Sequence, residues 1–230
     1  MPVEFARPDT VLELESEVEG RILIHGRGNT LRIGKNVVLT ASIWLQGDGG
    51  LVEIGDGCNI NGMIRTLRGD GGVLRIGRGT TINAAGISMH ETGEINIGED
   101  CMFSTDIHMD VSDMHPIYDR ATGRRINPAR SITIGDHVWL GTRVLVTKGA
   151  VIGAGAVIGA GSMVVGEIPP NVIAAGTPAR VMRTGVEWRR EFVEHIDPVA
   201  DPRPSGFRAW LNRVIPLRPK ASTNPRIFRA

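Results

Sequence analysis

The sequence predicts an all-β protein built as a parallel β-helix, and three observations carry this prediction. From Ile134 the chain repeats every six residues, and most repeats open on an aliphatic residue followed by glycine. Three such hexads span the 18 residues from Ile134 to Ile152, as one triangular coil requires. Farther upstream, Ile-Gly pairs recur at steps of 21 or 22 residues. A six-residue period excludes an amphipathic helix, whose apolar residues recur at three and four.

The same repeat orders the rest of the chain. Residues 11–15 (Val-Leu-Glu-Leu-Glu) alternate in polarity, which predicts a strand that caps the open end of the β-helix. Coils are expected from about Ile22 to Ala175, and the proline-containing segment 176–180 ends them. The upstream coils each add a corner bulge, as indicated by the positions of Ile33-Gly34, Ile54-Gly55, Ile76-Gly77 and Ile97-Gly98.

One interruption of the repeat is long. After Ile97 the next Ile-Gly pair begins at Ile134, a step of 37 residues. This step equals two coils and one residue, or one coil and a 19-residue excursion. The excursion is favoured, because residues 109–130 lack hexads and are rich in Asp, His, Arg and Pro. Insertions of this size in repeat folds lie on one face and commonly carry function, so we expect the active-site loop at about 109–130.

Length and composition set the remaining limits. The 230 residues predict one domain (1–184) followed by a tail (185–230). The net charge of +1 gives no support for a nucleic-acid partner. The N-terminus does not resemble a signal peptide, and no run of 18 apolar residues occurs, so a cytoplasmic location is expected.

Both cysteines occupy the fifth position of a hexad, in coils two steps apart. Because strands stack about 4.8 Å apart, the Cα atoms of Cys58 and Cys101 are expected roughly 10 Å apart. That separation is too large for a disulfide, so both are predicted to be buried, reduced side chains.

Two short helices are predicted in the tail, at Gly185–His195 and Phe207–Ile215. Residues 202–230 contain seven Lys or Arg and no Asp or Glu, and the second helix has one apolar face. Two interpretations stay open: peripheral contact with an anionic membrane at its inner face, or packing on the same or a neighbouring β-helix.

The hexads from Ile134 to Met163 and the closing run 168–181 (IPPNVIAAGTPARV) resemble the hexapeptide-repeat acyltransferases, including galactoside and maltose acetyltransferases. The segments 112–119 (SDMHPIYD) and 125–129 (RINPA) are more similar to the capsule, lipopolysaccharide and polysialic-acid O-acetyltransferases. This resemblance covers about residues 20–183. It implies a left-handed β-helix, transfer from acetyl-CoA to a saccharide hydroxyl without a metal, and a homotrimer whose sites lie between subunits.

Acetyl transfer to a hydroxyl needs a general base, a task that suits a histidine. Of the six histidines, His115 stands at the position of the family's catalytic histidine. Asp113 would lie on the same face of an extended segment and orient its ring. The alternative is a loop histidine bonded to a neighbouring carbonyl. The others are placed outside catalysis: His25 and His137 at solvated corners, His90 in a corner bulge, His195 in the tail and His108 facing outward.

The resemblance also implies a coenzyme A site. Trp139 projects outward and would wall the tunnel near the thioester, although burial in a trimer interface is the alternative. Arg180 and Arg183 match arginines that contact phosphates. Small residues along the corner would let the pantetheine arm approach the backbone, namely Gly141, Ala160 and Ala175. The chain departs from its relatives at Val165-Gly166, where they often carry Thr-Lys, which predicts weaker binding or a different donor; Lys148 lies one coil earlier.

The sequence says less about the acceptor than about the donor and the catalytic base. Candidates to line its site are Asn83, Met89, His108, Tyr118, Arg124 and Arg125. The adjacent arginines suit an acidic sugar or form a solvated face. A second class of function stays open: a non-catalytic trimeric scaffold, or a zinc-binding relative of β-helix carbonic anhydrases using His90, His108 and His115. Six residues separate His108 from His115, whereas that family has four.

Overall fold

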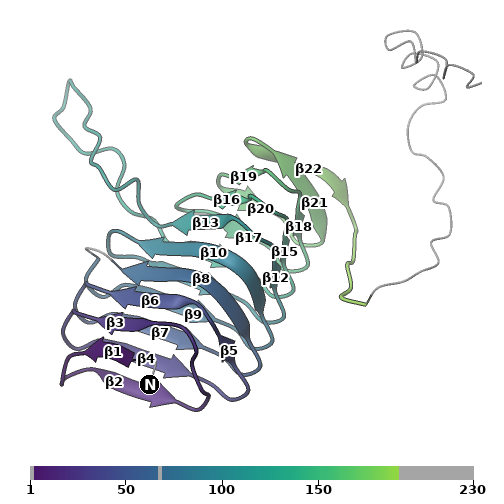
Figure 1. Cartoon of the computed structure of the whole chain (residues 1–230). Helices are drawn as coiled ribbons and strands as arrows, with labels where there is room; N and C mark the ends of the chain where they lie inside the picture. Colours follow the sequence, from purple (N-terminus) through teal and green to yellow (C-terminus); the bar gives the residue numbers. More distant parts are fainter. Residues whose placement is uncertain (1–2, 67–68, 192–230) are drawn as a thin grey trace, which may run out of the picture. The chain divides into compact units, whose positions relative to one another are not determined.

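The computed structural model describes residues 3–66 and 69–191, and these residues form a parallel β-helix of about eight turns without any helix (Figure 1). One face is an eight-stranded sheet with one strand from each turn. Its strands, in spatial order, are β2 (Val11–Leu14), β4 (Thr30–Ile33), β7 (Leu51–Ile54), β9 (Val73–Ile76), β11 (Glu94–Ile97), β14 (Ile132–Ile134), β17 (Val151–Ile152) and β20 (Glu167–Ile168).

A 14-stranded sheet wraps around the other two faces. The second face contains β5 (Val38–Leu39), β12 (Met102–Phe103), β15 (Trp139–Leu140), β18 (Val157–Ile158), β21 (Val172–Gly176) and β22 (Ala179–Thr184). The third contains β1 (Val3–Ala6), β3 (Ile22–Ile24), β6 (Ser42–Leu45), β13 (Ile107–Asp110), β16 (Leu145–Val146) and β19 (Met163–Val164). Two long strands, β8 (Asn59–Thr66) and β10 (Thr81–Met89), cross both faces.

The core is a stack of aliphatic rows, as the hexads predict. On the first face, pairing aligns the isoleucines that end successive strands, and all are nearly inaccessible to solvent: Ile33, Ile54, Ile76, Ile97, Ile134 and Ile152, each followed by glycine, and Ile168, followed by proline. Cys58 and Cys101 are buried thiols that are not joined in a disulfide, which confirms their prediction. Desolvation raises the pKa of both thiols, that of Cys101 to about 11.

The 37-residue step is one coil and an excursion. β11 pairs directly with β14, with Ile95 opposite Ile132 and Ile97 opposite Ile134. The intervening chain completes the coil through β12 and β13 and then leaves the stack as a long loop, drawn in teal beyond β13 in Figure 1. The prediction of an insertion rather than a further coil is confirmed, and its function stays a prediction.

The C-terminal end of the stack is a hairpin, because β22 runs antiparallel to β21 after the proline-containing turn. The predicted helix at Gly185–His195 is wrong over its described part, since residues 185–191 form only bends and irregular chain. Val186 N–H instead donates to Asn171 O at 3.0 Å, and the Trp188 side chain is buried. These contacts override local helix propensity. The rest of that helix and the predicted helix Phe207–Ile215 lie outside the described residues.

Among the described residues, no helix long and apolar enough to cross a membrane was found.

Candidate active site

The long loop (residues 111–131) connects β13 to β14 and folds back on itself. The Ile126 N–H donates to the Ile117 carbonyl at 2.8 Å. Near the tip, both the N–H and the hydroxyl of Thr122 donate to the Asp119 carboxylate at 2.7 Å. The loop therefore has a defined backbone although it lies outside the stack of coils.

An ion pair ties the loop to the preceding coil. The Arg125 guanidinium donates two hydrogen bonds to the Glu91 carboxylate, at 2.7 and 2.6 Å, and the Ser112 hydroxyl donates to the same group. Arg125 first, and then Ser112, lower the pKa of Glu91 from 4.5 to about 2. A role for Arg125 in binding an acidic sugar would thus compete with an internal carboxylate.

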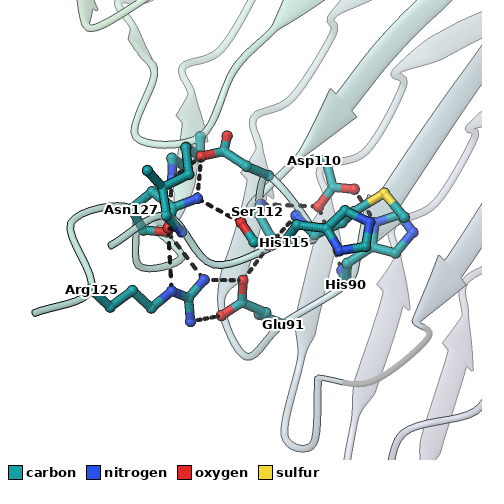
Figure 2. Close-up of polar contacts among 11 residues, drawn as sticks. His90, Glu91, Asp110, Ser112, His115, Arg125 and Asn127 are labelled. Atoms are coloured by element: carbon teal, nitrogen blue, oxygen red, sulfur yellow. Dashed lines mark hydrogen bonds and ion pairs between the residues drawn. The ribbon is translucent and has the colours of Figure 1, made fainter. Parts of the chain in front are cut away.

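Asn127 joins the two limbs of the loop (Figure 2). Its side chain is buried, and its Nδ2 donates to the Asp113 carboxylate and to the His115 carbonyl, both at 2.9 Å. Its Oδ1 accepts a hydrogen bond from the Ile117 N–H at 2.6 Å. We did not predict Asn127 from the sequence, although it lies in the 125–129 stretch that carries the family resemblance.

A second ion pair ties the loop to the following coil. Lys148, in the turn after β16, places its Nζ 2.5 Å from Oδ2 of Asp113. Lys148 first, and then Asn127, lower the pKa of Asp113. The side chain of Lys148 is 17% exposed, so this pair is partly shielded from water. The Asp113 carboxylate is therefore occupied by two partners from its own chain.

The imidazole of His115 is exposed. Its backbone N–H donates to the Asp113 carbonyl at 2.7 Å, but no hydrogen bond reaches its ring within residues 3–66 and 69–191. The structure thus brings Asp113 and His115 together through the backbone and through Asn127. The orienting contact between the Asp113 carboxylate and the ring stays a prediction.

A histidine–aspartate pair lies at the base of the loop and was not predicted. The buried His90 hydrogen-bonds through Nδ1 to Oδ2 of Asp110, and the other oxygen of Asp110 accepts the Ser112 N–H at 3.0 Å. Figure 2 shows this pair beside the first residues of the loop. No local motif signals it, because the stacking of β10 on β13 brings together residues 20 positions apart.

His108 faces outward on β13, as predicted, and lines a groove of about 240 Å³. Its ring lies over Gly86, where an added Cβ would approach Nδ1 to 2.9 Å. The groove is otherwise lined by Gly62, Met63, Ala84, Ala85, Asp106 and Ile107. Its floor is mostly backbone and small side chains, which gives a flat ligand close access to the chain.

The other predicted acceptor residues are dispersed. Asn83 is exposed on β10, one residue before the groove begins, and Tyr118 is exposed in the loop. Tyr118 forms an antiparallel bridge with Arg125. Met89 belongs to the core, with no exposed surface, so its prediction as a sugar contact is wrong. It ends β10 on the inward-facing side, opposite Thr66.

Most of the predicted coenzyme A residues lie along one edge of the second face. Gly141 follows β15, and a Cβ there would come within 2.7 Å of the Ala160 nitrogen in the next coil. Ala175 lies one coil farther, on β21, and pairs with Arg180 on β22. Arg180 and Arg183 are both exposed. This edge thus combines small residues with two exposed arginines, of which Arg180 donates to the Ala179 carbonyl at 2.9 Å.

Trp139 is 38% exposed on β15 and contacts the ring of Trp188 at a centroid distance of 6.0 Å. The neighbouring His137 is not the solvated corner residue that we predicted. Its Nδ1 bonds Asp100 at 2.6 Å, and its Nε2 donates to the Trp188 carbonyl at 2.9 Å. Within the described chain, no group of three or more His, Cys, Asp or Glu is arranged to hold a metal ion.

Comparison with known proteins supports this assignment of the fold. Residues 131–166 match the family described as bacterial transferase hexapeptide (six repeats). The crystal structure of the polysialic acid O-acetyltransferase OatWY is 29% identical, covers 82% of this chain and 91% of its own, and has a TM-score of 0.74. The crystal structure of the polySia-specific acetyltransferase NeuO is 30% identical in sequence, and the match covers 88% of this chain and 94% of NeuO with a TM-score of 0.70.

Curated relatives match over shorter segments. The polysialic acid O-acetyltransferase of Neisseria meningitidis is 32% identical over 130 residues, or 56% of this chain and 60% of that protein. The enzyme of the same description from Escherichia coli O1:K1 / APEC is 48% identical over 96 residues, or 42% and 31%. The matched segments thus span less than two thirds of either relative. Because the likeness to NeuO extends over nearly the whole of both chains, the protein belongs to the hexapeptide-repeat acyltransferase family.

Proposed function

We propose that the protein is an acetyl-CoA-dependent O-acetyltransferase that acetylates a hydroxyl of a sugar or polysaccharide precursor, with His115 as the general base. The observation that carries this proposal is the long loop itself. It presents an exposed imidazole, whereas the neighbouring charged side chains Asp113 and Arg125 are paired within the chain, with Lys148 and Glu91 respectively. Relatives similar in fold over most of this chain are described as polysialic acid O-acetyltransferases.

The reaction needs two proton transfers, one from the acceptor hydroxyl to the imidazole and one from the imidazolium to the leaving thiolate. The imidazole of His115 takes the proton from the acceptor hydroxyl as its oxygen attacks the thioester carbonyl. The tetrahedral intermediate then collapses, the C–S bond breaks, and the imidazolium returns the proton to the leaving thiolate. The products are an O-acetyl ester and free coenzyme A. An exposed ring suits this role, since both substrates must reach it.

The donor fits the edge formed by Gly141, Ala160 and Ala175. A Cβ at Gly141 would collide with the backbone of the next coil, so the surface there stays close to the main chain. Arg180 and Arg183 would hold phosphates at the end of this edge. Trp139 would cover the thioester end, next to Trp188.

The loop and this edge lie on different parts of one subunit, so we propose a homotrimer in which the loop of one subunit reaches the edge of its neighbour. A lone β-helix would also leave Trp139 and Leu145 well exposed. Sedimentation at micromolar concentration should show a trimer. A monomer that binds coenzyme A at full affinity would contradict a site between subunits.

The direct test is transfer from acetyl-CoA, followed by release of free thiol and by mass spectrometry of the acceptor. Oligosialic acid and simple galactosides form the first acceptor panel, because relatives of both descriptions match this chain. Acceptor-dependent thiol release with a mass gain of one acetyl group supports the proposal. Binding of acetyl-CoA without transfer to any sugar would favour a non-catalytic protein.

A further inference from the structure

Three of the polar groups around His115 converge on a single side chain. Asn127 donates to the carbonyl of His115 and to the carboxylate of Asp113, two residues before it, and accepts from the amide of Ile117, two residues after it. A primary amide has two N–H donors and one acceptor oxygen. Both donors are therefore used, and the oxygen is shared with Nε of Arg125 at 3.4 Å.

The backbone of Asn127 is held as firmly as its side chain. Its carbonyl oxygen accepts from Nη2 of Arg125 and from Nζ of Lys148, both at 3.1 Å. Arg125 is in turn paired with Glu91 of the preceding coil, and Lys148 belongs to the following coil. Two ion pairs, one from each neighbouring coil, thus fix the residue that fixes His115.

We infer that Asn127 is a positioning residue that sets the backbone of His115, and that the pairs Glu91–Arg125 and Asp113–Lys148 form the clamp that holds Asn127. This inference rests on the proposed function of His115. The imidazole has no side-chain partner among the described residues, so its location depends on its backbone. Groups that react must be held within fractions of an ångström, and a misplacement of about 1 Å can cost about a hundredfold in rate.

The clamp lies outside the hydrophobic core. None of its members belongs to the buried aliphatic cluster, which is built from the rows inside the coils. Removing the Nδ2 donors should therefore disturb the loop and leave the β-helix folded. This separates a positioning role from a general role in stability.

The test is Asn127→Asp, which replaces the two N–H donors by an acceptor in the same shape. It places a carboxylate against the His115 carbonyl and the Asp113 carboxylate, so both contacts become repulsive. We expect kcat to fall about 10- to 100-fold. The KM for acetyl-CoA should stay within about twofold, since the donor edge is untouched.

Asn96→Asp is the matched control. Asn96 also donates to a carboxylate, Glu94, and accepts from an arginine, Arg75, but it lies on the eight-stranded face, away from the loop. It should keep wild-type kcat. If Asn127→Asp does not fold, Lys148→Met removes one cation from the clamp without adding a charge at the His115 carbonyl and should show the same loss confined to kcat.

Amide hydrogen exchange supplies a readout that does not need turnover. The His115 amide, which donates to the Asp113 carbonyl, should exchange faster in Asn127→Asp than in the wild type, with amides of β11 and β14 unchanged. Wild-type kcat in Asn127→Asp, while His115→Ala is inactive, would overturn the positioning role. If the wild type itself transfers no acetyl group, the proposed function fails. Hydrogen exchange then tests the clamp by itself: unchanged protection of the His115 amide would overturn the clamp, and faster exchange would support it.

Discussion

Trp188 stacks on the imidazole of His137, with ring centroids 3.9 Å apart and planes within 6° of parallel. The indole N–H also donates to the His137 carbonyl at 2.8 Å. Residues 51 positions apart in the sequence thus form one aromatic unit, and Trp139 touches its edge. The C-terminal segment therefore shapes the surface next to the proposed thioester site.

Substitutions at Trp188 should separate stacking from hydrogen bonding. Trp188→Phe retains a ring over His137 and loses the indole donor, which should cost about 1 kcal/mol of unfolding free energy. Trp188→Ala also loses the stacked area and should cost about 3 kcal/mol or more. Urea unfolding measures both. Equal losses in the two variants would show that the stacking contributes nothing.

His115→Ala should leave the β-helix folded and lower acetyl transfer at least about a hundredfold, the usual size for losing a general base. His25→Ala is a suitable control, because His25 is an exposed histidine near the N-terminal end whose ring stacks on Phe5. Steady-state kinetics with acetyl-CoA decide the outcome. Wild-type turnover in His115→Ala would move the search for the base to His108 and to His90, which Asp110 holds.

Arg180→Ala and Arg183→Ala should each raise the KM for acetyl-CoA about tenfold, because each loses about one hydrogen bond to a charged group. The kcat should change by no more than a few-fold, since phosphates are bound equally in the ground and transition states. Arg78→Ala, which removes an exposed arginine paired with Glu99, is the control and should leave both constants unchanged. A loss confined to kcat would place these arginines in another role.

The stability of the loop should fall as the pH is lowered. The pKa of Glu91 is lowered from 4.5 to about 2, and that of Asp113 is lowered as well. A carboxylate with a depressed pKa in the folded state contributes stability that is fully present above its unfolded pKa. That contribution is lost as pH falls from about 4.5 towards 2.

Glu91→Gln tests this dependence. The variant should be less stable than the wild type at pH 7, and the difference should shrink between pH 4.5 and 2. Glu99→Gln removes a more exposed ion pair and should show a smaller effect at every pH. Chemical denaturation at a series of pH values provides the measurement. A difference independent of pH would show that the charge of Glu91 is not what the loop depends on.

Gly62 permits the bend of β8 between two faces and should not tolerate a side chain. Its φ is +125°, and a Cβ would lie 2.1 Å from the Ala85 carbonyl oxygen. Gly62→Ala should cost about 3 kcal/mol or more, from strain and overpacking together. Gly161→Ala has a φ of +71° with open space around the Cβ and should cost only about 1 to 2 kcal/mol. Similar losses at both positions would contradict the steric argument.

The sequence by itself determined the coils, the placement of the insertion and the loop that carries His115. These features are periodic or interrupt a period, and a repeat fold stacks each coil only on its neighbours, so local spacing is sufficient. The coenzyme A edge formed by Gly141, Ala160 and Ala175 came instead from the family resemblance. The orientation of His115 did not, nor did the true surroundings of His137.

Only the tertiary structure decided which side chains meet. Asn127 bonds Asp113 and His115 across the loop, and Arg125 pairs with Glu91, 34 residues away. Trp188 packs on His137 in a segment for which the sequence had predicted a helix. None of these contacts repeats with the coil. Each depends on the register in which coils stack and on the path of a loop outside that register, and long-range packing of this kind overrides the propensities that a sequence displays locally.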